Sequence, residues 1–261
     1  MDNKVIVITG SSKGIGHGLA ECFLKAGHSV VITGTSQKSV DEAAASFEKY
    51  SGKFIATVCD VTSKESVEAL VNTADKAYGR IDIWINNAGI THSSKSIMEL
   101  EDDEIKKVVD VNLLGMINGS RAAGKYMLAK KSGSIYNMEG LGSDGRIANG
   151  SAYYGTTKRA LRYFTRCLAK EMEGTGVIVG RLSPGMALTQ LLLKDVENSP
   201  NKESTLKIFK ILADKVEVVT EYLSKEVLKN QKNGAYIAWL TTPKIMYRFM
   251  SAPFTKRDPF K

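Results

Sequence analysis

Short apolar runs alternate with amphipathic stretches along the chain, beginning at its fourth residue. Several of these runs are continuously apolar, which indicates strands covered on both faces, as in parallel sheets. We therefore predict seven strands, at residues 4–9, 29–33, 54–60, 81–86, 133–137, 177–182 and 235–240.

The stretches between these runs have the spacing of amphipathic helices. One apolar stripe ends at Gly27 and another precedes the sixth run; their members are Ile15, Leu19, Cys22, Phe23 and Ala26, and Leu161, Phe164, Leu168 and Met172. Strands that alternate with helices predict an α/β fold. We expect a single doubly wound Rossmann-type domain over residues 1–261, with a seven-stranded, mainly parallel sheet and helices on both faces.

Two segments stand apart from this alternation. Residues 186–232 form a long insertion after the carboxyl end of a strand, where ligands bind in such sheets, so we expect it to cover the substrate. Helices that only pack are the alternative. Residues 241–261 form a basic, aromatic tail with Lys244, Arg248, Lys256, Arg257 and Lys261 against one acid, Asp258, interleaved with Tyr247, Phe249, Phe254 and Phe260.

The tail's composition suits a subunit contact or a peripheral contact with an anionic membrane face, and packing on its own domain is an equally open alternative. Elsewhere the net charge of +8 comes from bases scattered among acids. No zinc-finger spacing and no arginine-rich arm occurs, so nucleic acid is not an expected partner. No apolar run approaches the ~20 residues that span a bilayer.

Three separated cysteines, Cys22, Cys59 and Cys167, fit buried free thiols in a reducing compartment. The first apolar run starts almost at once, with no targeting segment before it. These features predict a cytoplasmic protein, and no residue pattern predicts a metal site.

A glycine-rich loop at residues 9–16 follows the first predicted strand and opens the first helix. Its glycines permit a tight turn and a close backbone approach to a pyrophosphate, and the helix N-terminus supplies free N–H groups. This context predicts a dinucleotide site whose candidate contacts are Gly10, Ser12, Lys13, Gly14, Ile15 and Gly16.

The end of the second strand bears on the choice of cofactor. An acid there would hold the adenosine ribose and repel a 2′-phosphate. This chain has no acid before Asp41; it offers Ser36 and Lys38, and Lys13 is able to reach the same region. Hydroxyls and a cation suit a phosphate, so NADP(H) is favoured over NAD(H).

Tyr154 and Lys158 are four residues apart, which places both on one helix face. A cation near a phenol lowers its pKa, so such a tyrosine is able to exchange a proton with a carbonyl oxygen. Tyr126 and Lys130 have the same spacing. Only Tyr154 follows a strand and a glycine-rich loop, 140–150, which places it at the carboxyl edge of the sheet. We therefore predict Tyr154 as the proton-transferring residue.

Taken in order, these motifs resemble the short-chain dehydrogenase/reductase family. They are the glycine loop, Asp60-Val61, Asn86-Asn87-Ala88-Gly89, Asn112, Tyr154-x-x-x-Lys158 and Ser183-Pro184-Gly185, and the match covers residues 4 to about 240. The resemblance implies an oxidoreductase that uses a nicotinamide cofactor and acts on a small-molecule carbonyl or alcohol. A homodimer or homotetramer is expected.

The resemblance also implies roles for individual residues. Asp60 and Val61 would flank the adenine, and Asn87, Ala88 and Gly89 would line the cofactor. Asn112 would hold a water in a proton relay to Lys158. Lys158 would also bond the nicotinamide ribose, and the carboxamide would be bound by Pro184, Gly185, Met186 and Thr189.

The chain departs from the family where a serine usually follows the fifth strand. The aligned position is Gly140 or Leu141, and neither carries a hydroxyl. Ser143 is the nearest substitute, and we predict that it polarises the substrate together with Tyr154; closing of the loop by Ser143, or a backbone N–H donor, are the alternatives.

That departure resembles the chlorophyll b reductases. The pattern Asn-Met-acid-Gly-x-Gly-Ser-Asp-Gly at residues 137–145 carries the likeness, and later stretches at 183–186 and 216–223 are also similar. Those enzymes reduce a formyl group on a chlorin ring, so a bulky aldehyde or ketone is the expected substrate. Two alternatives remain: a generic dehydrogenase for an acyl, sugar or steroid-like alcohol, and a cofactor-binding sensor that has lost catalysis.

Overall fold

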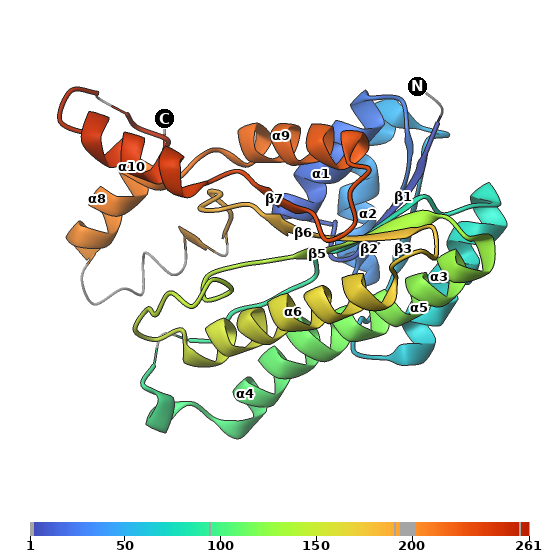
Figure 1. Ribbon diagram of the computed structural model, residues 1–261, viewed down its shortest axis with the longest axis horizontal. Helices are drawn as coiled ribbons and strands as arrows, with labels where there is room; N and C mark the ends of the chain where they lie inside the picture. The colour runs from blue at the N-terminus through green and yellow to red at the C-terminus, as the bar shows by residue number, and fades with distance from the viewer. Residues whose placement is uncertain (1–2, 94, 191, 194–201, 256, 261) are drawn as a thin grey trace.

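Seven parallel strands form one sheet at the centre of the molecule (Figure 1). The computed structural model describes residues 3–93, 95–190, 192–193, 202–255 and 257–260. The order across the sheet is β3-β2-β1-β4-β5-β6-β7, and every described pairing is parallel. The strands are β1 (Val5–Ile8), β2 (Ser29–Gly34), β3 (Phe54–Val58), β4 (Ile83–Asn86), β5 (Gly133–Met138), β6 (Val177–Ser183) and β7 (Tyr236–Ala238).

Helices cover both faces of this sheet. They are α1 (Gly14–Lys25), α2 (Gln37–Ser46), α3 (Lys64–Tyr78), α4 (Asp102–Val109), α5 (Gly115–Lys130), α6 (Ala152–Glu171), α8 (Lys202–Leu212), α9 (Val216–Lys229) and α10 (Thr242–Ser251). A π-helical turn, Asp110–Leu114, joins α4 to α5, and short 3-10 turns lie at Glu48–Tyr50 and Ile97–Glu99.

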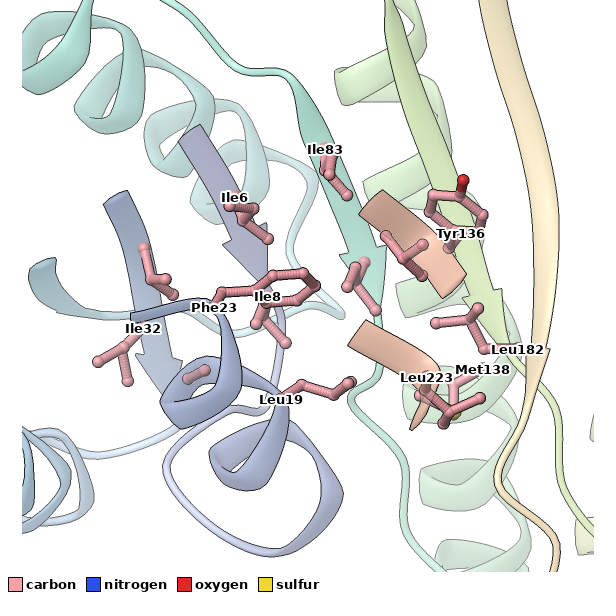
Figure 2. Close-up of a cluster of buried hydrophobic side chains, with 14 of the residues drawn as sticks. Ile6, Ile8, Leu19, Phe23, Ile32, Ile83, Tyr136, Met138, Leu182 and Leu223 are labelled. Carbon is pink, nitrogen blue, oxygen red and sulfur yellow. The ribbon is translucent and has the colours of Figure 1, made fainter. Parts of the chain in front are cut away.

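Alternate residues of each central strand enter two separate cores. Ile6 and Ile8 pack with Phe23 of α1 and with α9 on one face, as Figure 2 shows. Val7 packs with Trp84 on the opposite face, under α3, α5 and α6. Successive side chains of a strand point to opposite faces, so a strand covered on both sides must be apolar throughout. The predicted doubly wound fold is confirmed, and the sheet is wholly parallel.

The insertion predicted to cover the substrate divides into two parts. Its last helix, α9, buries Val219, Leu223 and Val227 in the same core as Ile8 and packs along α1. These apolar positions recur every four residues, so they form one stripe that closes a face of the sheet. The packing alternative therefore holds for α9. Covering of the substrate by the segment before it stays a prediction, and residues 191 and 194–201 lie outside the described residues.

The tail forms α10 beside α8 at one end of the molecule (Figure 1). Two of its cations, Arg248 and Arg257, bond inward to Asp214, so they do not serve an outer surface. Lys256 and Lys261 lie outside the described residues. Within the described ranges, no helix combines the length and apolar character needed to cross a bilayer.

Candidate active site

The loop after β1 and the loop after β4 meet at the carboxyl edge of the sheet. Gly10 has a φ of +62°, and a Cβ there would lie 2.8 Å from the Cα of Ala88, so only glycine fits. The backbone N–H groups of Asn87 and Ala88 donate to Thr9 Oγ1 at 3.0 and 3.1 Å. Asn87 Nδ2 also donates to the carbonyl oxygens of Thr9 and Gly10, each at 3.0 Å. Asn87 and Ala88 thus fix the shape of the glycine-rich loop.

The first turn of α1 suits an anion. No side chain caps this helix at Lys13, and no acid occurs in its first turn. The helix therefore presents free N–H groups and the positive end of its dipole at the sheet edge. Thr189, in the loop after β6, reaches the same place, since its Cγ2 lies 3.6 Å from where a Cβ of Gly14 would be. These residues fit a pyrophosphate held between the two loops.

The segment that follows β2, from Thr35 to Lys38, is exposed. Ser36 caps α2, because its hydroxyl accepts the N–H of Ser39 at 3.3 Å. Both lysines of this region are exposed. The Nζ of Lys38 lies 4.0 Å from the carboxylate of Glu42, and Lys13 is exposed in the glycine-rich loop. The first turn of α2 contains no acid. The nearest acids along α2, Asp41 and Glu42, lie beyond this turn beside Gln37 and Lys38, and contact of Ser36 with a phosphate stays a prediction.

Asp60 and Val61 lie after β3 and differ in their surroundings. The exposed carboxylate of Asp60 accepts the N–H and the hydroxyl of Thr62 at 2.9 and 2.8 Å. Val61 is buried in the core, and a Cβ on Gly115 of α5 would lie 2.5 Å from its Cγ2. The structure therefore shows Val61 as a packing residue, and its predicted contact with adenine stays a prediction.

Tyr154 and Lys158 share one face of α6, beside the end of β5. The Lys158 Nζ lies 5.7 Å from the centre of the Tyr154 ring and donates to the carbonyl oxygen of Met138 at 3.1 Å. Lys158 is buried, and this burial lowers its pKa to about 8, while the charge of Glu139 acts in the opposite direction. An ammonium held beside a phenol favours the phenolate, as proton transfer by Tyr154 requires.

Gly140 lies directly against the tyrosine hydroxyl. A Cβ on Gly140 would lie 2.3 Å from the Tyr154 hydroxyl oxygen and 3.3 Å from Lys158 Cε. Of the two positions at which the family's serine is missing, Gly140 is therefore the one that faces Tyr154. Leu141 points away and is 45% exposed.

Ser143 is buried and closes the loop after β5. Its hydroxyl accepts the backbone N–H of Gly140 at 3.1 Å, and its own N–H donates to the carbonyl oxygen of Gly140 at 3.1 Å. Arg159 donates to the Ser143 carbonyl oxygen at 3.0 Å. Loop closure, one of the alternatives stated above, is thus present. A hydroxyl that accepts one bond still has a proton to donate, so its predicted action on a substrate stays a prediction.

Asn112 lies fully buried in the π-helical turn. Its Oδ1 accepts the N–H of Ile90 at 2.8 Å, and its Nδ2 donates to the Ile90 carbonyl oxygen at 2.8 Å and to Thr157 at 3.3 Å. Asn112 thereby fastens the loop that contains Gly89 to the helix that carries Lys158. π-helical turns are common at functional sites. The water relay implied by the resemblance stays a prediction.

Glu139 is a charged residue of the site for which the sequence predicts no role. Its side chain is 3% exposed and accepts from Arg181 of β6 at 2.9 Å, with Arg162 of α6 at 3.9 Å. Buried carboxylates are rare unless they are paired. An acid directly after a predicted central strand is the signal that would have drawn attention to it. Its charge raises the pKa of the neighbouring Lys158.

Apolar side chains are exposed in the loops after β4 and β5, which leave the carboxyl edge of the sheet. Met98 is 90% exposed and Ile147 is 95% exposed, and Ile97 and Leu141 are also exposed. Large exposed apolar groups near a site favour a bulky, apolar ligand. The described residues include no group of three or more histidine, cysteine or acidic side chains arranged to hold a metal ion.

Sequence comparisons match this chain to a known family and to plant enzymes. The profile of the family described as short chain dehydrogenase matches residues 4–200. Chlorophyll(ide) b reductase NOL from Arabidopsis thaliana is 39% identical, and the match covers 94% of this chain and 72% of that protein. The probable chlorophyll(ide) b reductase NYC1 of the same plant is 34% identical over 95% of this chain and 52% of its own length. The chain thus spans about half of this second relative. Both relatives are named as chloroplastic.

Solved structures agree with the fold. The 3-ketoacyl-(acyl-carrier-protein) reductase from Brucella melitensis, complexed with NADH, has a TM-score of 0.80 and 25% identity, over 91% of this chain and 97% of that one. ElxO with NADP bound has a TM-score of 0.77 and 26% identity over the same shares. These neighbours contain both forms of the cofactor.

Proposed function

The chain belongs to the short-chain dehydrogenase/reductase family and is an oxidoreductase, and on this premise we propose that it uses NADPH to reduce a bulky aldehyde or ketone. The chemistry resembles that of its relatives named as chlorophyll(ide) b reductases. The observation that carries the proposal is the packing of the Tyr154 hydroxyl against Gly140 beside the buried Lys158, together with exposed apolar side chains in the loops after β4 and β5.

The bound cofactor supplies the hydride. Tyr154 gives its hydroxyl proton to the carbonyl oxygen as negative charge develops there, which is general acid catalysis. Lys158 stabilises the phenolate that remains, because its ammonium is held by the carbonyl oxygen of Met138 within reach of the tyrosine ring. Asn112 joins the loop after β4 to α6, so the position of Gly89 relative to the proton donor Tyr154 is fixed.

Preference for NADPH rests on the end of β2. No acid lies between the last residue of β2 and Asp41, the first turn of α2 has no acid, and Lys13 is exposed. We expect NADPH to bind more tightly than NADH in fluorescence titrations. Lys13→Ala should weaken NADPH and leave NADH nearly unchanged, because only the 2′-phosphate needs the cation. Equal or tighter binding of NADH by the wild-type protein would contradict this preference.

The substrate is tested directly by NADPH oxidation. Chlorophyll b and chlorophyllide b should be compared with a panel of simpler aldehydes and ketones under identical conditions. Turnover of the chlorins supports the proposed substrate class. Turnover restricted to acyl, sugar or steroid-like compounds would favour the generic dehydrogenase, and NADPH binding without turnover of any compound would favour the sensor.

Self-association is part of the proposal. A groove of 690 Å³ runs between loop 142–148 and the outer face of α6, beside Tyr163, which is 72% exposed. Such a concave apolar surface suits a second subunit, and we propose a homodimer or homotetramer. Light scattering after size exclusion tests this, and a monomeric wild-type protein would rule it out.

A peripheral membrane contact is proposed for the outer face of α10. Met246, Tyr247 and Met250 are exposed there and Phe254 is exposed just after the helix, although Arg248 and Arg257 of the same tail point inward. The contact would therefore depend on apolar insertion more than on charge. Co-sedimentation with anionic vesicles should be lost in the Met246→Ser, Met250→Ser double variant. Equal binding by that variant, or none by the wild type, would count against the contact.

A further inference from the structure

Asp214, between α8 and α9, gathers donors from three parts of the chain. Its carboxylate is buried and accepts the indole N–H of Trp239, after β7, at 2.6 Å. Arg248 of α10 donates to both carboxylate oxygens, at 2.8 and 3.2 Å, and Arg257 of the tail donates to one of them. The end of the sheet and two arginines of the tail therefore converge on one side chain.

The backbone of the same residue bonds the loop after β6. The Asp214 N–H donates to the carbonyl oxygen of Met186 at 2.9 Å, and the Leu188 N–H donates to the carbonyl oxygen of Asp214 at 2.9 Å. Ala187 and Asp214 thus form a short parallel bridge. This loop continues to Thr189, which lies beside Gly14 of the glycine-rich loop.

The tail arginines also hold the end of α8. Arg248 donates to the carbonyl oxygen of Leu212 at 2.9 Å, and Arg257 donates to those of Ile211 and Ala213, each at 2.6 Å. The last carbonyls of a helix lack partners within it and carry its negative end, so guanidinium groups stabilise them. Phe209 and Ala213 in turn form a small apolar cluster with Met186, Leu188 and Leu192.

We propose that the C-terminal tail stabilises the loop after β6, residues 186–189, and we call this arrangement the clasp. In the clasp, Arg257 and Arg248 bind the Asp214 carboxylate, and the Asp214 backbone binds the loop. Arg257, Arg248 and Asp214 are then positioning residues: they touch neither cofactor nor substrate, and they act through the backbone of Met186 and Leu188. The inference rests on the proposed function only in assigning residues 186–189 to the nicotinamide end of the cofactor.

The charges around Asp214 make one arginine removable. Lys244 adds a third cation beside Trp239, and its burial, with Arg248 nearby, lowers its pKa to about 8. Three cations thus lie around the single negative charge of Asp214, so the loss of one still leaves that charge paired. Arg257→Ala leaves Asp214 paired with Arg248, so no buried charge is stranded. Asp214→Asn, in contrast, would leave two arginines without a counter-charge, and the fold itself would be at risk.

The test combines hydrogen exchange with cofactor titration on the full chain. In Arg257→Ala, the Leu188 amide should exchange about tenfold faster, because its acceptor on Asp214 is less firmly held. NADPH should bind roughly tenfold more weakly, while kcat at saturating NADPH stays within about twofold, since the reacting groups are untouched. Arg257→Lys should recover part of both effects. Arg80→Ala is the control, because it removes an arginine from the Arg80–Asp82 pair, which lies at the amino end of β4 and not at the carboxyl edge of the sheet.

Exchange at Leu188 decides the clasp by itself. Unchanged exchange in Arg257→Ala, or equally faster exchange in Arg80→Ala, would overturn it. If the wild type binds no NADPH, the proposed function fails, yet faster exchange at Leu188 in Arg257→Ala alone still supports the clasp. If NADPH binds and only kcat falls in Arg257→Ala, a positioning role toward the cofactor is refuted.

Discussion

Two Tyr-x-x-x-Lys pairs in this molecule share one geometry and differ in their surroundings. In both pairs the lysine Nζ lies 5.7 Å from the centre of the tyrosine ring. Tyr126 of α5 donates its hydroxyl to the carboxylate of Asp75 at 2.5 Å, and Lys130 is exposed. Tyr154 of α6 lies against Gly140 at the carboxyl edge of the sheet, and its lysine is buried.

The difference lies in which form of the tyrosine each environment favours. Burial and the Asp75 carboxylate raise the pKa of Tyr126 to about 12, so this hydroxyl keeps its proton. Lys158 lies beside the Tyr154 ring and donates to the carbonyl oxygen of Met138, and its ammonium favours the loss of a proton from Tyr154. Spacing alone places the two groups on one helix face; the neighbours decide whether the pair is suited to catalysis.

The largest expected effect comes from removing each hydroxyl in turn. Tyr154→Phe should lower kcat by ~10²–10⁴-fold and leave NADPH binding nearly intact, because the ring remains and only the acid is lost. Tyr126→Phe should change kcat by less than about twofold, since its hydroxyl only bonds Asp75. Steady-state kinetics and NADPH titration of both variants provide the measurement. A Tyr154→Phe enzyme with near wild-type turnover would refute the assignment.

A smaller loss is expected when the family's serine is restored. In Gly140→Ser the new Cβ would lie 2.3 Å from the Tyr154 hydroxyl, so the tyrosine must move by an ångström or so. Misplacement of about 1 Å can cost roughly 10²-fold, and we expect a decrease in kcat of that order. Gly124→Ser on α5 is a control, because a Cβ there meets only ordinary contacts. Activity above wild type in Gly140→Ser would show that this glycine is not matched to Tyr154.

Ser143 is expected to have a still smaller effect. Ser143→Ala should lower kcat by at least tenfold if its hydroxyl polarises the substrate, because removal of a direct oxyanion donor can cost ~2.7–4 kcal/mol. Thermal stability and NADPH affinity should stay nearly unchanged. Lower thermal stability with full kcat would instead show that the Ser143 hydroxyl only closes the loop, by accepting the N–H of Gly140.

The fold and the active pair follow from local patterns, whereas the surroundings of the pair do not. Continuous apolar runs predict parallel strands, and a glycine loop between a strand and a helix predicts a dinucleotide site. The ion pair of Glu139 with Arg181 joins the loop after β5 to β6, and the bonds of Asp214 join the end of α8 to the tail. Such contacts depend on tertiary packing, so neither spacing nor composition reveals them. For the same reason, composition leaves outward contact and packing of the tail on its own domain equally open, and only the structure shows that Arg248 and Arg257 bond inward.

The smallest effect is also the most direct probe of the two environments: opposite pH dependence of stability. Lys158 has a pKa of about 8 when folded and an ordinary value of 10.5, so the unfolded chain binds more protons in that interval. Wild-type stability should therefore rise relative to Lys158→Met as pH increases from about 8 to 10. Tyr126 has the reverse shift, from 10.0 to about 12, so the folded chain holds its proton longer. Wild-type stability should fall relative to Tyr126→Phe as pH increases above about 10.

Urea unfolding of the wild type and the two variants between about pH 7.5 and 11 measures both slopes of stability against pH. Subtracting each variant from the wild type cancels the titrations that the proteins share. Slopes of the same sign would mean that the two pairs do not differ electrostatically, and the distinction between them would then rest on position alone.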